Sequence, residues 1–239
     1  MSYTKTGTSG KTIAILQSNY VPWKGYFDLM SLVDELVLYD DVQFTRRDWR
    51  NRNRLKSPGG VRWLTIPVRV KGRYLQRIDE TEVSDPGWAR RHWSTLVGWY
   101  ASAPCFEQYR PVIEDLYLGS RDRHLSQINR RFLEALRDIL GISTPLRSSS
   151  DYAVEGRKTE RLLAICHSAG ADRYISGPAA RAYLDEDRFR ADGIEVAWMT
   201  YDGYPEYPQL YPPFDHGVSV LDLLFSVGDE APRYMLGGR

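Results

Sequence analysis

Cysteine, long apolar runs and an excess of charge of one sign are all scarce in this sequence. Its two cysteines, Cys105 and Cys166, are too few for a disulfide framework and fit no metal-ligand spacing. No stretch approaches the ~18–20 apolar residues of a membrane-spanning helix. The formal net charge of +1 gives no overall reason to expect nucleic acid or an anionic membrane as a partner. We therefore predict a cytoplasmic protein with no membrane span.

Several catalytic motifs are also missing. The four histidines form no HxxxH or HExxH pattern, and no GxSxG motif or P-loop is present, so we predict no metal site. His92 is the one histidine that we consider as a general base, because its helix face also carries Trp88 and Tyr100. The alternative is a packed core histidine.

Aromatic residues, in contrast, are abundant, with seven Trp and sixteen Tyr among 239 residues. Rings in this number either enlarge a core or line a pocket for a flat or sugar-like ligand. The contents of 42% hydrophobic and 26% charged residues are those of an ordinary globular protein with a sizeable core.

The first fifty residues predict a β-α-β unit. Residues 12–17 form an apolar run typical of a buried parallel strand, residues 25–33 have helical spacing, and residues 36–39 form the next strand. The same alternation returns late in the chain, with helices expected at 159–168 and 179–184, strands at 174–175 and 194–199, and a last helix at 218–225 before a frayed tail.

Two insertions interrupt this alternation. Residues 44–58 form a strongly basic loop, followed by a strand within residues 61–70 and a returning hairpin strand at 74–78. Residues 85–141 have helical periodicity, beginning at Asp85 as a helix N-cap and ending at a C-terminal glycine. The predicted fold class is α/β, a Rossmann-like parallel sheet with a basic loop and hairpin insertion and an inserted helical block. It forms a single domain, 12–239, after a flexible leader, 1–11.

Polar residues follow both of the first two strands, where a parallel sheet builds a site at its carboxyl edge. Gln17 follows the first strand, and Asp40 and Asp41 follow the second. Consecutive side chains leave a strand on opposite faces, so we expect one functional acid and one structural acid. The alternative is that both acids cap the chain or pair with nearby arginines.

The basic loop supplies planar cations and amides beside an aromatic ring. Arg50, Asn51 and Arg52 suit phosphate or carboxylate recognition, and Trp49 offers a ring for stacking. Nucleic acid would fit such a loop. Because the rest of the chain is not basic, we favour an anionic small molecule or the phosphopantetheine arm of a carrier protein.

Three motifs, LQ-x-x-Y-x-PW-x-GYF, DDVQF-x-R-x-x-WRNRN and WLT-x-PV, closely resemble the WbqC-like protein family. The resemblance continues through YASAPCF at 100–106, YISG at 174–177 and SVLDLLF at 219–225. Members occur in bacterial gene sets for O-antigen, other surface polysaccharides and specialised metabolites. The resemblance implies a transferase that joins an acyl or aminoacyl group to an amine.

A weaker likeness connects residues 16–29 and 176–181 with the nucleotidyltransferase superfamily that includes pantothenate synthetase. Trp23 and Tyr26 stand where that superfamily has two histidines, around the matching Gly25. Because those histidines stabilise the transferring phosphoryl group, their loss argues against adenylyl transfer.

Together, these observations lead us to expect an acyltransferase that forms an amide from an activated thioester, either a CoA or a carrier-protein thioester, and a small-molecule amine or amino sugar. A thioester is already activated, so no cofactor is needed. The alternatives are an ATP-dependent amide ligase, a non-catalytic carrier-protein-binding scaffold, and a thioester cyclase or hydrolase. Nucleic acid is not an expected partner.

The catalytic candidates are Asp40, Asp41 and His92. The candidates for substrate binding are polar or aromatic residues at the expected sheet edge and in the loops around it: Gln17, Tyr20, Trp23, Tyr26, Gln43, Trp49, Arg50, Asn51, Arg52, Ser176, Tyr201, Tyr207 and Gln209.

Overall fold

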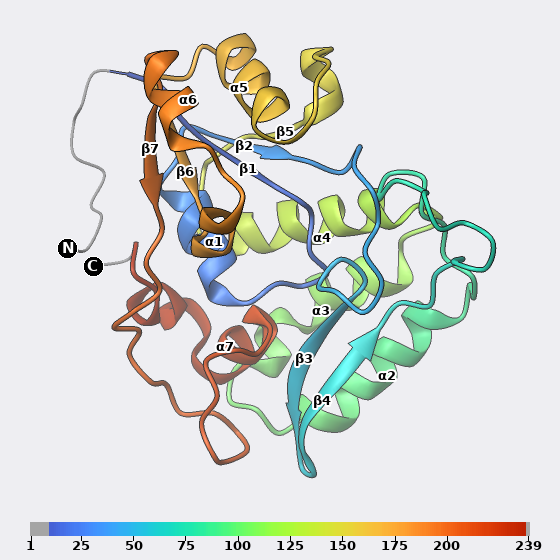
Figure 1. The fold of residues 1–239 in the computed structure, drawn as a ribbon. Coiled ribbons are helices and arrows are strands. Elements are labelled where there is room, and N and C mark those ends of the chain that lie inside the picture. Colours follow the sequence, from blue (N-terminus) through green and yellow to red (C-terminus); the bar gives the residue numbers. More distant parts are fainter. Residues whose placement is uncertain (1–9, 238–239) are drawn as a thin grey trace.

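The computed structural model describes residues 10–237, which fold around a five-stranded parallel sheet (Figure 1). Its strands are β1 (Thr12–Leu16), β2 (Glu35–Leu38), β5 (Leu146–Ser148), β6 (Arg173–Ser176) and β7 (Glu195–Trp198), in the order β5-β2-β1-β6-β7. The chain first builds outward from β1 through β2 and then returns to the other side of β1. This is the strand order of a doubly wound sheet, so the predicted Rossmann-like α/β fold is confirmed.

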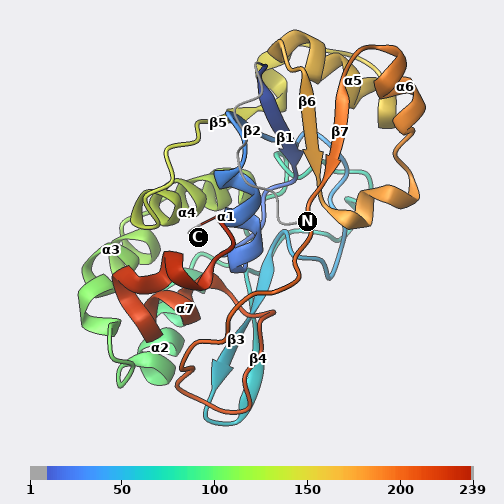
Figure 2. The same cartoon turned by 90° about the vertical axis from the view of Figure 1, so that its left-hand side faces the viewer.

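Helices cover both faces of this sheet (Figure 2). Successive side chains of a strand alternate between its faces. Ile13 and Ile15 therefore join a cluster with α5 (Lys158–Ala169) and α6 (Glu186–Ala191). The intervening Ala14 joins the larger cluster on the opposite face, which contains the apolar residues of α1 (Lys24–Ser31) and α4 (Leu125–Ile139).

A two-stranded hairpin and three further helices extend the larger cluster away from the sheet. The hairpin pairs β3 (Arg52–Ser57) with antiparallel β4 (Gly60–Thr65). The helices are α2 (Trp88–Tyr100), α3 (Phe106–Leu118) and α7 (Val220–Val227). Rings from all three helices meet, with the Phe225 centroid 5.2 Å from Tyr100 and 5.1 Å from Phe106. None of the described helices is long and apolar enough to cross a membrane.

The hairpin differs from its prediction. Its first strand begins at Arg52, inside the segment predicted as a loop, because Leu55 and Lys56 turn inward and are buried. Residues 74–78 form no strand; Arg77 makes one isolated bridge to Gln43, and Tyr74 is exposed.

The helix predicted from Asp85 begins at Trp88, although the Asp85 carboxylate still accepts a hydrogen bond from the Gly87 N–H (2.8 Å). Strand β5 and the short 3-10 helix Ser149–Tyr152 were not predicted. In place of a helix at 179–184, residues Pro178–Ala182 form a 3-10 helix.

The described residues next to the two ends of the chain are more ordered than expected. Of the predicted leader, residues 1–9 lie outside the described residues, but the Lys11 ammonium donates to Glu35 (3.0 Å). The tail predicted to fray instead forms the 3-10 helix Gly228–Tyr234, which buries Ala231, and Met235 is buried just beyond it.

A buried chain of hydrogen bonds joins α2, α3 and the loop after β1. The Thr65 carbonyl can only accept, so His92 Nε2–H donates to it (3.0 Å) and His92 Nδ1 accepts from the Tyr20 hydroxyl (2.9 Å). The Tyr20 oxygen in turn accepts from the Tyr117 hydroxyl (2.6 Å). Burial lowers the pKa of His92 to about 4, so the ring is neutral at neutral pH.

This histidine should make folding stability depend on pH. The unfolded chain takes up the His92 proton near pH 6.5, whereas the folded chain resists it down to about pH 4. Stability is therefore fully present above pH 6.5 and is lost as the pH falls, by up to about 1.4 kcal/mol per pH unit. Urea denaturation between pH 7 and pH 4 should show a smaller pH slope for His92→Phe than for the exposed control His167→Phe. Equal slopes would contradict this role for His92.

Candidate functional site

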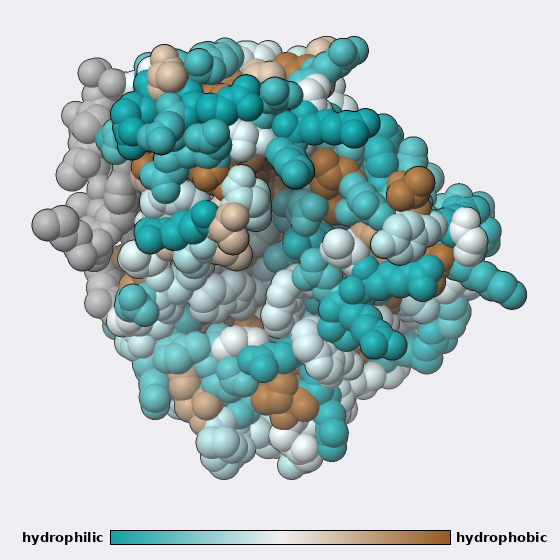
Figure 3. All heavy atoms as spheres, in the orientation of Figure 1, coloured by the Kyte–Doolittle hydropathy of each residue, from teal (hydrophilic) through white to brown (hydrophobic). Residues whose placement is uncertain are grey.

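The carboxyl ends of β1 and β6 form a crevice, because the connections from these neighbouring strands run to opposite sides of the sheet. Such a switch point is where doubly wound sheets bind ligands. A cavity of about 400 Å³ lies there. The space-filling view shows this face hollowed near its centre (Figure 3). The cavity is lined by Ile15, Leu16, Gln17, Asn19, Trp23, Tyr26, Tyr39, Arg50, Lys158, Leu162, Tyr174, Ser176, Gly177, Ala179, Ala180, Tyr183 and Tyr201.

The polar groups of the cavity are amides, hydroxyls and two cations. Arg50 reaches the cavity from the basic loop and donates to the side-chain oxygen of Asn19 and to Asp48 (3.4 Å). Lys158, the first residue of α5, also lines the cavity and has a left-handed backbone, with φ of +50°. Among the described lining residues there is no carboxylate and no imidazole. The cavity is therefore suited to an anionic group.

Aromatic side chains make up much of the remaining wall. The rings of Trp23 and Tyr201 contact edge to face, with centroids 5.0 Å apart. Burial raises the pKa of Tyr201 to about 12 and also raises the pKa of Tyr26. Both phenols therefore keep their protons at neutral pH. Tyr26 donates its proton to the Gln17 carbonyl (3.3 Å), and the Tyr201 hydroxyl can donate to a ligand.

The loop between β1 and α1 is held in a strained conformation. Val21 has a φ of +37°, which is rare for a β-branched residue. The side-chain amide of Asn53 donates to the carbonyls of Tyr20 (3.0 Å) and Val21 (3.1 Å). The buried amide of Asn129 donates to Ser18 Oγ (2.9 Å) and to the Arg50 carbonyl (2.8 Å). The cavity wall is thus fixed before any ligand arrives.

Asp40 and Asp41 have different hydrogen-bond partners, and neither lines the cavity. Asp40 is buried and accepts a hydrogen bond from the Ser18 N–H (2.8 Å); burial raises its pKa, although the bonds from Ser18 oppose this. Asp41 accepts from the Ser149 hydroxyl (2.6 Å) and pairs with Arg161. Both acids line a separate hollow of about 120 Å³.

The remaining predicted site residues are divided between the cavity and its surroundings. Gln17, Trp23, Tyr26, Arg50, Ser176 and Tyr201 line the cavity. Tyr20 and His92 lie in the core. Gln43 donates to the Tyr74 carbonyl and Asn51 donates to the Ile66 carbonyl. Trp49 and Arg52 lie on the hairpin surface around Trp63.

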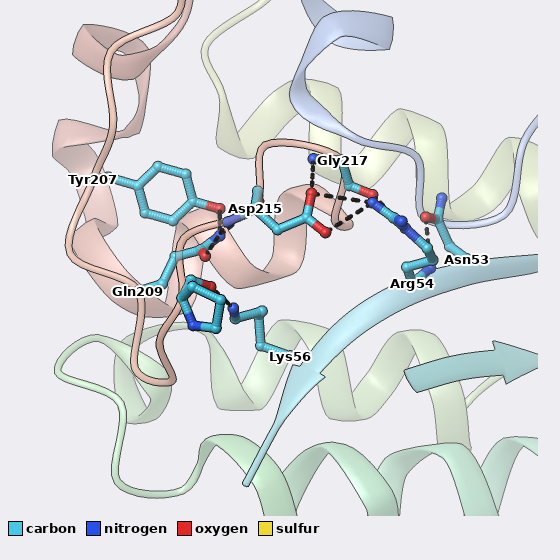
Figure 4. A network of polar contacts seen from close by, with 8 residues as sticks. Asn53, Arg54, Lys56, Tyr207, Gln209, Asp215 and Gly217 are labelled. Atoms are coloured by element: carbon cyan, nitrogen blue, oxygen red, sulfur yellow. Dashed lines mark hydrogen bonds and ion pairs between the residues drawn. The ribbon is translucent and has the colours of Figure 1, made fainter. Parts of the chain in front are cut away.

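Tyr207 and Gln209 belong to a polar network that ties the loop after β7 to the hairpin (Figure 4). Arg54 pairs with Asp215 (3.0 Å), and the Gln209 amide donates to the Asp215 carbonyl (2.9 Å). The Tyr207 hydroxyl donates to the buried carboxylate of Asp222 (2.8 Å). These contacts anchor the loop that carries Tyr201.

Sequence reasoning missed several lining residues: Asn19, Tyr39, Lys158, Tyr174 and Tyr183. Tyr39 directly follows a predicted strand, so its position was a usable signal. Lys158 had none: it is exposed, and nothing in the sequence distinguishes it from other exposed lysines. Arg181, the last residue of the segment that resembles the nucleotidyltransferase superfamily, does not line the cavity; its guanidinium lies over the Trp198 ring (5.0 Å).

Fold and site together define a doubly wound α/β protein with an aromatic, cationic cavity at the switch point of its sheet. The chain belongs to the WbqC-like protein family, whose model matches residues 17–234. It is 50% identical over 225 residues to an uncharacterized protein of Mycobacterium tuberculosis, Rv1507c, covering 94% of this chain and 97% of that protein. No solved structure matched the chain. No group of acids, histidines or cysteines in residues 10–237 is arranged to hold a metal ion.

Gly25 should be essential for the position of Trp23. A β-carbon added at Gly25 would come within 2.3 Å of the Trp23 ring, so the ring would have to move off the cavity wall. We expect Gly25→Ala to lower the free energy of unfolding by about 1–3 kcal/mol, as overpacking does. Urea denaturation measures the change.

Gly98→Ala is the matched control, since the same addition inside α2 meets nothing within 4 Å. Removing a helical glycine there should stabilise the protein by up to about 1 kcal/mol. If both substitutions stabilise the protein, Gly25 does not accommodate Trp23.

Proposed function

We propose that this protein is an acyl or aminoacyl transferase that forms an amide from a thioester and an amine in the switch-point cavity. The observation that carries the proposal is the lining of that cavity. It combines two cations, two side-chain amides and neutral phenols, and its described lining residues include no carboxylate or imidazole. Such a lining favours a donor that carries an anionic group and an acceptor amine that reacts in its neutral, unprotonated form.

The cations favour the reactive form of the acceptor. An alkylamine is protonated in water and cannot attack a carbonyl until it loses a proton. Arg50 and Lys158 disfavour a third positive charge nearby, so a bound amine has a lowered pKa. The neutral nitrogen then attacks the thioester carbonyl, the C–N bond forms and the C–S bond breaks. The thiolate that leaves takes up the proton that the amine releases.

We propose that the side-chain amide of Gln17 stabilises the developing oxyanion. Gln17 follows β1 at the cavity, and fixed amide donors stabilise a tetrahedral intermediate more than its ground state. Proton transfer through Asp40 or Asp41 stays a prediction, as the alternative to uptake by the leaving thiolate. Neither acid lines the cavity, and Asp41 accepts hydrogen bonds on both carboxylate oxygens.

Replacing Gln17 should therefore slow the transfer step. For Gln17→Leu we expect kcat to fall by about 10²–10³-fold with a small change in KM. Intact-mass analysis of aminoacyl thioesters incubated with amines, without ATP, gives the rates. Gln108→Leu, an exposed glutamine on α3, is the control. If the wild-type protein forms product only with ATP, the ligase alternative replaces this proposal.

Arg50 should discriminate between donors by their charge. A charge-assisted hydrogen bond is worth about 1.5–3 kcal/mol, so Arg50→Gln should raise KM for a CoA thioester at least about tenfold. KM for the phosphate-free N-acetylcysteamine thioester should change much less. Arg110→Gln, an exposed arginine on α3, serves as the control. An equal loss for both donors would mean that Arg50 shapes the cavity and does not bind the anion.

A further inference from the structure

Charge is distributed very unevenly along this nearly neutral chain. Residues 44–77 contain eleven Lys and Arg against one acid, Asp48, a net charge of +10. Because the whole chain carries +1, all other residues together carry −9. This contrast is local to the hairpin and the loops on either side of it. The proposed catalytic cavity uses one of these eleven cations, Arg50.

Most of the other cations face solvent. Arg54 and Lys56 turn inward to Asp215 and to the Pro213 carbonyl. Arg52 is half-buried, and the exposed cations are Arg46, Arg47, Arg62, Arg69, Lys71, Arg73 and Arg77. Acids that follow the segment pair with some of them; Glu82, for example, lies 3.5 Å from Arg69 and 3.3 Å from Arg73. Arg47, Arg62 and Lys71 form no ion pair with any described residue.

The same segment exposes large apolar side chains. Trp49 and Trp63 are 40% and 44% exposed, with ring centroids 5.2 Å apart. The Arg52 guanidinium lies 4.0 Å from the Trp63 centroid. Tyr74 and Leu75 are 75% and 77% exposed at the tip of the next loop. Trp, Tyr and Arg are the residues on which protein interfaces most often depend, so this face has the composition of a docking surface.

We propose that the face formed by residues 44–77 docks an acidic protein that presents the acyl group to the cavity. The acyl-carrying role of that partner rests on the proposed function, whereas the docking itself does not. Trp49 precedes Arg50, which lines the cavity, so a partner seated on this face lies beside the place where its cargo would react. In Figure 3, hydrophilic side chains with apolar residues between them extend from the central hollow toward the right of the view.

Charge complementarity favours a protein over nucleic acid as the occupant. A standard interface covers about 800 Å² on each partner, which a compact basic patch can supply. A long polyanion would extend beyond residues 44–77 and meet a molecule whose remaining charge is −9. The same negative region would turn the basic face toward an approaching acidic protein, which speeds its association.

The test measures binding of a fluorescently labelled, phosphopantetheinylated acyl carrier protein by anisotropy at low and moderate salt. We expect Arg47→Glu combined with Lys71→Glu to weaken binding at least about tenfold, through lost attraction and added repulsion. Trp63→Ala should also weaken it. Arg90→Glu combined with Arg147→Glu makes the same change of charge outside the segment and should bind as the wild-type protein does. A labelled oligothymidine is tested in parallel.

The docking proposal is overturned if the carrier protein does not bind, if both charge reversals act equally, or if oligothymidine binds more tightly through the same residues. Transfer from the N-acetylcysteamine thioester separates this outcome from the proposed function. If the protein uses that small donor but does not bind the carrier protein, only the docking proposal is wrong. If it binds the carrier protein but transfers an acyl group from no thioester, the transferase proposal is wrong and the docking proposal stands.

Discussion

The strained loop that leaves β1 is the constraint on which the site depends. Val21 adopts a backbone conformation that its β-branched side chain disfavours, and buried amides from Asn53 and Asn129 hold the chain in it. These amides come from the hairpin and from α4, so the two insertions into the sheet architecture are required for the site. The Asn129 amide also fixes the Arg50 carbonyl, which couples the shape of the loop to the position of the cavity's guanidinium. Strain of this kind persists where the surrounding structure overdetermines it.

The fold followed from the sequence wherever burial left a periodic signal. Strands β1, β2, β6 and β7 were predicted because parallel strands covered on both faces appear as apolar runs. Strand β5 was missed because it is three residues long and its middle residue, Arg147, is exposed at the sheet edge. Strand β3 was missed because its alternating arginines and asparagines resemble a loop; its buried side includes Asn53, whose partners are backbone carbonyls distant in sequence.

Less of the site than of the fold could be predicted from the sequence, because the sequence does not show which way a loop side chain turns. Position after a strand made Gln17 and Ser176 candidates at the sheet edge, and both line the cavity, because parallel strands end at one edge. It could not show that Tyr20 turns into the core to meet His92, or that Asp41 is bound by Arg161, 120 residues further along the chain. The WbqC-like motifs are consistent with both outcomes, because they combine residues of the cavity with residues that hold the loop in place.

The uneven charge of the molecule has a consequence for its behaviour in concentrated solution. A chain that is nearly neutral overall but carries +10 in one segment and −9 elsewhere behaves as an electric dipole. In buffer of low ionic strength, the basic face of one copy attracts the acidic remainder of another, so the molecules favour head-to-tail contacts. Physiological salt, with a Debye length of about 8 Å, screens this attraction at distances beyond contact. Added salt should therefore reduce association between copies of this protein. In a protein with a large net charge, salt instead weakens the repulsion that keeps the copies apart.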